Sequence, residues 1–191
     1  MERTVDLIIY DESGIRFKFK NPANKYDDCE FYKKYSVFKA VDFLTLNDNQ
    51  SRLYLIEVKN FSGHEGESNC RERLNPRGSD PLHIEVAEKV RDTITVLYGA
   101  SRNSEKKDVE DLKTFYEAML GLGVKISVIA FVEGKLSGYS KGHKDGVFGL
   151  ERFIKKHLEW LNCEVRVLNT DIVSDNSAIQ KIMECEILNN G

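Results

Sequence analysis

Two carboxylates and a lysine interrupt two apolar runs in the first third of the chain. The runs are Ala40–Leu46 and Arg52–Asn60, and the charged residues within them are Asp42, Glu57 and Lys59. Apolar runs separated by a short polar tip are typical of buried strands joined by a turn, so the segment predicts a β-hairpin. Because hard divalent cations bind carboxylate oxygens, the two acids indicate a Mg²⁺ or Mn²⁺ site.

The register of this hairpin decides whether the charges meet. A four-residue loop and a two-residue loop both place Leu44 opposite Leu55 and Asp42 opposite Glu57. Since side chains alternate along a strand, Asp42, Glu57 and Lys59 then share one face. Like charges that lie opposite each other destabilise a sheet, and a bound cation would offset that cost. The spacing leaves one alternative open, an ion pair between Lys59 and either carboxylate at the rim of the sheet.

Composition favours one globular domain over residues 1–191, because 41% of the residues are hydrophobic and 31% are charged. The sequence has no apolar run of membrane-spanning length and no signal-peptide layout, so we expect a cytoplasmic protein without a membrane partner. Four scattered cysteines without a CxxC pair argue against zinc and against a disulfide framework. The net charge of −3 excludes a generally basic nucleic-acid binder, so nucleic acid would need a local basic patch.

Periodic patterns surround the hairpin and predict an α/β or α+β fold with a mixed sheet flanked by helices. Residues 4–10 and 15–20 predict an N-terminal hairpin, and residues 25–37 are ambiguous between a short helix and a loop. The remaining expectations are a loop over 61–82, helices over 80–99 and 105–120, a strand over 124–132, a loop over 134–149, a helix over 150–161, a strand over 163–168 and a final turn or helix over 174–185.

Basic side chains outside the hairpin are candidates for contacts with nucleic acid. They are Arg71, Arg73, Lys141, Lys144, Lys155 and Lys156. Simple solvated charges are the alternative for each of them. On the helix after the hairpin, Glu85, Glu88 and Lys89 could line the same pocket as Lys59, but ion pairing on the helix surface is the favoured interpretation.

The order of these features resembles the PD-(D/E)xK nuclease superfamily, which includes restriction endonucleases and Holliday-junction resolvases. Val41-Asp42 precedes a hairpin, Glu57-Val58-Lys59 follows it, and a helix and a strand come next. By position, Asp42 matches the first acid of the motif, Glu57 the second and Lys59 the lysine, while Val41 replaces the proline. The resemblance covers residues 40–132, and residues 150–191 would be a C-terminal helix–strand–helix elaboration. It implies a restriction-endonuclease-like core.

The resemblance implies an endo- or exodeoxyribonuclease that hydrolyses DNA with Mg²⁺ or Mn²⁺. Asp42, Glu57 and the backbone carbonyl of Val58 would bind the metal, and Lys59 would orient or deprotonate the attacking water. Many members supply a further acid from an upstream helix, for which Glu30 is the first candidate and Asp28 the second. Two alternatives stay open: an inactive nuclease-like module that binds nucleic acid or a protein, and an unrelated α/β protein with a structural ion-pair cluster. The oligomeric state stays open too, a homodimer included.

Overall fold

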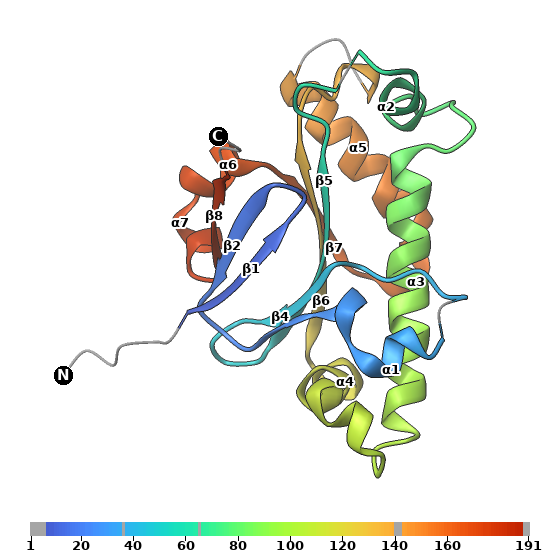
Figure 1. The fold of residues 1–191 in the computed structure, drawn as a ribbon, viewed down its shortest axis with the longest axis vertical. Coiled ribbons are helices and arrows are strands. Elements are labelled where there is room, and N and C mark those ends of the chain that lie inside the picture. The colour runs from blue at the N-terminus through green and yellow to red at the C-terminus, as the bar shows by residue number, and fades with distance from the viewer. Residues whose placement is uncertain (1–6, 36, 65, 140–142, 189–191) are drawn as a thin grey trace, which may run out of the picture.

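The main sheet has five strands and is mixed, as the sequence predicts. A computed structural model describes residues 7–35, 37–64, 66–139 and 143–188. The strands follow the order β3-β4-β5-β6-β7 (Figure 1). Their bounds are Ala23–Lys25, Phe43–Leu46, Arg52–Asn60, Lys125–Glu133 and Glu164–Leu168. The pairs β3–β4 and β4–β5 are antiparallel, whereas β5–β6 and β6–β7 are parallel.

The β4–β5 hairpin has the predicted register. Leu44 pairs with Leu55 and Leu46 with Leu53, and all four side chains are fully buried in the core on the helical side of the sheet. Phe43, Tyr54, Ile56 and Val58 alternate with them and enter a second core on the opposite face. This alternation carries Glu57 and Lys59 toward the helices.

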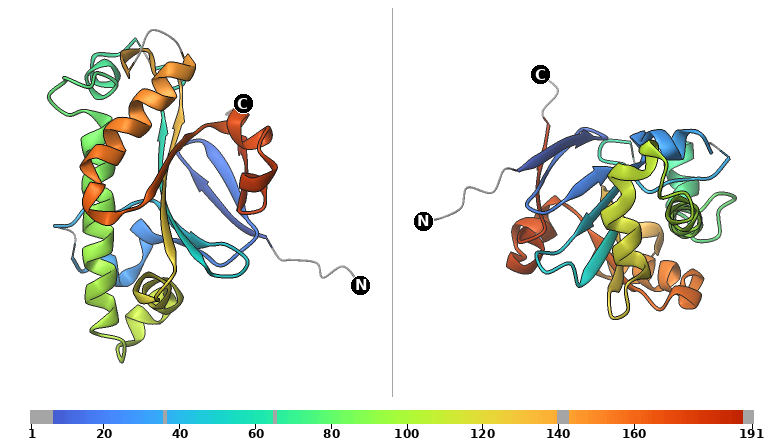
Figure 2. Two further views of the ribbon diagram at one scale, coloured as in Figure 1. Left: turned by 180° about the vertical axis from the view of Figure 1, so that it is seen from behind. Right: turned by 90° about the horizontal axis from the view of Figure 1, so that it is seen from below.

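One face of the main sheet is covered by helices. The long helix α3 (Leu82–Ser101) contacts both α4 (Lys113–Leu120) and α5 (His143–His157). Figures 1 and 2 show α3 running along this face, with α5 beside its first half and α4 near its end. A short helix, α1 (Glu30–Lys33), precedes β4. Within the described ranges, no helix combines the length and the apolar character that crossing a membrane requires.

A three-stranded antiparallel sheet covers the other face of the main sheet. Its order is β1-β2-β8, with bounds Ile8–Glu12, Ile15–Phe19 and Met183–Ile187. The predicted N-terminal hairpin is therefore confirmed, but its first strand covers Ile8–Glu12 and not residues 4–10, of which 4–6 lie outside the described residues. The final segment was expected to be a turn or helix, but it forms two short helices, α6 (Thr170–Ser174) and α7 (Ser177–Gln180), and then β8. Met183 is fully buried against this second core, and that burial stabilises the strand.

Three further segments differ from the sequence-based expectation. The predicted loop over 61–82 contains helix α2 (Ser68–Arg73), and the helix expected over 105–120 begins as a 3₁₀ turn, η2 (Lys107–Leu112). Helix α5 begins at His143, inside the predicted glycine-rich loop. A Cβ at Gly146 would lie 2.5 Å from the Leu136 carbonyl oxygen, and one at Gly149 would lie 2.6 Å from the Tyr139 carbonyl oxygen. These glycines therefore permit close packing of a helix and do not mark a loop.

Candidate active site

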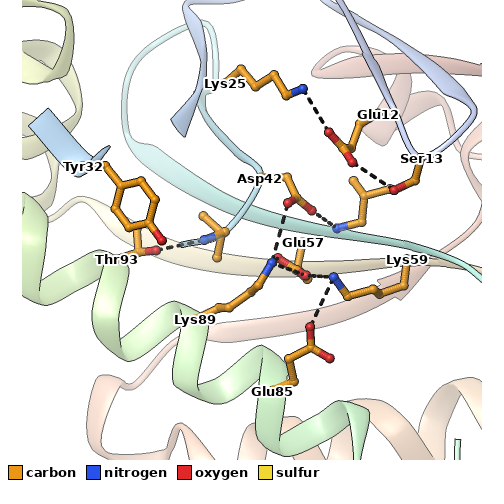
Figure 3. A network of polar contacts seen from close by, with 12 residues as sticks. Glu12, Ser13, Lys25, Tyr32, Asp42, Glu57, Lys59, Glu85, Lys89 and Thr93 are labelled. Carbon is orange, nitrogen blue, oxygen red and sulfur yellow. Dashed lines mark hydrogen bonds and ion pairs between the residues drawn. The ribbon is translucent and has the colours of Figure 1, made fainter. Parts of the chain in front are cut away.

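The structure brings Asp42, Glu57 and Lys59 together, as the register predicts. Asp42 lies just before β4, and its Oδ2 accepts a hydrogen bond from the Val58 N–H at 2.6 Å. The Lys59 ammonium forms a close ion pair with Glu57 Oε1. Figure 3 shows these side chains on the side of β5 that faces α3. The contact between Val58 and Asp42 uses the amide of Val58, so the role of its carbonyl as a metal ligand remains a prediction.

Helix α3 adds a glutamate and a lysine to this group. The Lys89 Nζ lies 2.7 Å from Glu57 Oε1, 2.9 Å from Glu57 Oε2 and 3.7 Å from Asp42 Oδ1. One turn earlier, Glu85 Oε1 lies 3.3 Å from the Lys59 Nζ. The sequence favours surface ion pairing for Glu85 and Lys89, and this interpretation is wrong for both residues. It holds for Glu88, which pairs with Lys39 at 2.7 Å.

A local sequence signal could have identified Glu85 and Lys89. Each directly precedes a fully buried valine of the helix, Val86 or Val90. Residues beside the buried stripe of a helix lie at the border of its contact with the sheet, and a carboxylate and an ammonium placed there can reach the sheet. This signal indicates that Glu85 and Lys89 lie near the sheet, but it does not indicate which strand they contact.

The position of Asp42 is fixed by the backbone around it. The Tyr26 N–H donates to the Asp42 carbonyl oxygen at 2.8 Å. On the other side, the Val41 N–H donates to Thr93 Oγ1 at 3.1 Å, and the Lys39 N–H donates to Asp92 Oδ2 at 3.0 Å. Because Asp92 and Thr93 belong to α3, the segment before β4 is held to the same helix that carries Lys89.

The two carboxylates are almost completely buried, at 1% exposure for Glu57 and 6% for Asp42. Burial, followed by the charge of Asp42, raises the pKa of Glu57 to about 7, although Lys59 and Lys89 oppose the shift. Burial also raises the pKa of Asp42. Burial lowers the pKa of Lys59, but Glu57 and Glu85 outweigh it and the net shift is upward, so its ammonium stays charged.

The candidate upstream acids lie in different places. Glu30 is exposed on α1 and lines a separate cavity with Lys34 and Asp108. Asp28 pairs with Lys25 and Lys33, so the structure brings neither candidate to Glu57. In the 3₁₀ turn η1 (Tyr26–Asp28), Asp27 is the acid that interacts electrostatically with Asp42. Burial and the charge of Asp42 raise the pKa of Asp27 to about 6, and its buried Oδ1 has no hydrogen-bond partner among the described residues.

A cavity of about 750 Å³ adjoins the group. Its lining residues are Lys39, Lys59, Asn69, Glu72, Arg73, Ser79, Asp80, Glu85 and Lys89. Asp42 and Glu57 are not among them, but Lys59 and Lys89, which pair with Glu57, both line the cavity. The cavity is therefore the route by which a ligand would reach the carboxylates.

Of the basic residues proposed for nucleic-acid contacts, Arg73 reaches this cavity. Its guanidinium pairs with Glu85 and lies 5.3 Å from the centre of the Phe61 ring. Arg71 instead donates to the Gly66 carbonyl oxygen at 3.0 Å, and Lys155 and Lys156 are exposed near the end of α5. Lys141 lies outside the described residues, as does the side chain of Lys144. Of the four basic residues whose side chains the structure describes, Arg73 is therefore the one that lines the cavity.

The residues present can be tested against a Mg²⁺ or Mn²⁺ ion. No three His, Cys, Asp or Glu side chains of the described ranges form a ready metal-binding group. Two opposed carboxylates do fit an ion that keeps water and substrate oxygens as its other ligands, as Mg²⁺ does. The Lys89 ammonium, which contacts both carboxylates, shows that a cation is stable at this point. The donor set thus fits a hard divalent ion with few protein ligands.

Comparison with known proteins gives a family but no activity. Residues 24–184 match the profile of DUF6661, described as a family of unknown function. The matched range includes Asp27, Asp42, Glu57, Lys59, Glu85 and Lys89. No curated protein and no solved structure matches the chain.

Proposed function

The chain belongs to DUF6661, a family of unknown function, and we propose from its site that it is a Mg²⁺- or Mn²⁺-dependent nuclease acting on DNA. One observation carries the proposal: Asp42 and Glu57 converge with Lys59, and Lys59 lines an open cavity. The preference for DNA rests on the resemblance to the PD-(D/E)xK superfamily. The antiparallel β4–β5 hairpin, followed by α3 and the parallel strand β6, supports that resemblance.

Asp42 and Glu57 would hold the metal, with the Val58 carbonyl as a further ligand. When bound, the metal would polarise the phosphate and lower the pKa of a water molecule. Lys59 lines the cavity, and its raised pKa keeps the ammonium protonated. A protonated lysine donates hydrogen bonds, so Lys59 would orient the water or stabilise charge on the phosphate and would not remove a proton. Arg73, on the same wall, would attract the phosphate backbone.

A nuclease-like module without catalysis is the second candidate. The observation in its favour is the Lys89 ammonium, which contacts both carboxylates and so balances their charge. Such a module would bind nucleic acid or a protein through the cavity and would not cleave DNA. The two candidates differ in one measurable property, which is metal-dependent turnover.

Cleavage of labelled DNA with Mg²⁺ or Mn²⁺ tests the proposal. We expect the wild-type chain to cut, EDTA to abolish cutting, and Asp42→Asn and Lys59→Met each to lower the rate by at least about 100-fold. Lys34→Met is the matched control, because Lys34 pairs with Asp108 at the surface, 2.5 Å away. Equal cutting by the wild type and Lys59→Met would refute the catalytic assignment. DNA binding without any cutting would favour the inactive module.

A further inference from the structure

We propose that Lys89 is the resident cation of the carboxylate pair: its ammonium holds the place of the divalent ion, and the ion must displace it to bind. The inference rests on the proposed function, because it concerns how a metal enters the same site. It adds a positioning role for a residue of α3 that lies outside the Asp42–Glu57–Lys59 motif.

The contacts of Lys89 are those expected of a bridging cation. Its Nζ lies within 3.0 Å of both oxygens of Glu57, at 2.7 and 2.9 Å, and 3.7 Å from Asp42 Oδ1. Lys59 has different contacts, with Glu57 on one side and Glu85 on the other. Lys89 is therefore the lysine that contacts both proposed metal ligands, whereas Lys59 contacts one of them (Figure 3).

A divalent ion and the Lys89 ammonium cannot both occupy the space between the carboxylates of Asp42 and Glu57. Asp42 and Glu57 are 6% and 1% exposed, so little water is available there to screen two cations from each other. Repulsion between like charges a few ångströms apart is strong at reduced dielectric. An ion that binds both carboxylates therefore replaces the contacts that Lys89 makes.

The structure offers Lys89 a place to move to. Its side chain is 17% exposed and already lines the cavity, together with two acids that belong to the cavity wall, Asp80 and Glu72. The lysine side chain has a flexible stem of four carbons. Rotation about the bonds of this stem can turn the ammonium toward the cavity without movement of α3. Metal entry is then an exchange of one cation for another at a nearly buried site.

The exchange predicts that loss of the lysine charge strengthens metal binding. Calorimetric titration of the full chain with Mn²⁺ and with Mg²⁺, after removal of bound metal by EDTA and dialysis, measures it. We expect Lys89→Met, which keeps the length without the charge, to bind either ion about tenfold more tightly than the wild type. Lys89→Arg keeps the charge, so its metal affinity should stay within about twofold of that of the wild type. Lys39→Met removes a cavity lysine that pairs with Glu88, and its metal affinity should also stay within about twofold.

The outcomes separate this inference from the proposed nuclease. If the wild type and Lys89→Met bind metal with equal affinity, or the variant binds more weakly, Lys89 is not a resident cation, but the nuclease proposal stands. If Lys89→Met binds and the wild type does not, the resident cation is supported and the metal-dependent nuclease is wrong. If neither binds either ion, both proposals are wrong.

A second measurement decides the matter on the wild type if Lys89→Met does not fold. Proton–nitrogen NMR correlations report lysine ammonium groups that are held in hydrogen bonds, and the signal lost in Lys89→Arg identifies Lys89. We expect that signal in EDTA and its disappearance when Mg²⁺ is added to saturation. A signal that stays unchanged at saturating Mg²⁺ would overturn the inference.

Discussion

Asp42 has a structural task that is independent of any metal. Its Oδ2 accepts the Val58 N–H at 2.6 Å, one residue before β4 begins. The side chain therefore continues the pairing of β5 beyond the last backbone pair, Phe43 with Ile56. An amide at this position keeps a carbonyl oxygen for the same bond, which makes Asp42→Asn a better test of chemistry than Asp42→Ala.

Asp27 gives a prediction at the same scale. Burial and Asp42 raise its pKa, and its buried Oδ1 is unpartnered among the described residues, so its charge acts on the proposed metal ligands. We expect Asp27→Asn to weaken Mg²⁺ binding by about fivefold, since one negative charge near the ion is lost. Calorimetric titration measures this. Glu30→Gln, on α1, should leave the affinity unchanged, and the reverse ranking would make Glu30 the upstream acid.

Local patterns predict some of these residues and not others. Leu44, Leu46, Leu53 and Leu55 alternate along two adjacent strands, so the register that joins Asp42 to Glu57 follows from sequence alone. The contact of Lys89 with Glu57 depends on how α3 crosses the sheet, which no local period determines. No local pattern predicts the position of Asp27 either, because the turn that contains it has no apolar repeat. Its neighbour Tyr26 is placed by a hydrogen bond from its backbone N–H to the Asp42 carbonyl oxygen.

At the scale of the element, α3 connects the site to the rest of the helical layer. Glu85 and Lys89 face the site, while Asp92 and Thr93 hold the segment before β4. At the start of the helix, buried His83 packs against α5: its ring centre lies 4.9 Å from that of Phe153 and 5.3 Å from that of His157. A change in the α3–α5 contact would therefore reach the carboxylates through one rigid helix.

His83 makes that contact sensitive to pH. Burial, with a smaller effect of His157, lowers the pKa of His83 from 6.5 to about 4. Between these values the unfolded chain binds more protons than the folded chain, so the free energy of unfolding decreases as pH falls through this window. We expect a loss of about 1–3 kcal/mol from this group. Urea titrations at several pH values should show a smaller loss for His83→Gln than for the wild type.

At the scale of the whole molecule, an aromatic cluster joins the two sheets. Phe17 of β2 is fully buried, with its ring centre 5.3 Å from that of Phe43 on β4 and 5.0 Å from that of Phe131 on β6. Since β1, β2 and β8 form a separate sheet among the described strands, contacts of this kind hold the small sheet to the main sheet. The sequence predicts the β1–β2 hairpin but not this packing, because it depends on which face the hairpin covers.

Phe17→Ala tests the importance of this junction. Removing a buried aromatic ring from a core costs about 3–5 kcal/mol, and we expect that loss in the free energy of unfolding measured with urea. Ile9→Ala is the control, because Ile9 is 53% exposed on β1 and should change the stability by less than about 0.5 kcal/mol. A small effect of Phe17→Ala would show that the small sheet contributes little to the cooperative unit.

The pairing of β2 with β8 has a consequence for biosynthesis. Phe17 is synthesised well before its strand partner Cys185. The second core is incomplete until Met183 has been made, so Phe17 and Phe19 stay accessible to solvent and to chaperones until then. The first core needs only segments that are made earlier, so a stalled nascent chain that ends before β8 should hold the carboxylate group on the helical face of the main sheet while the opposite face lacks β8.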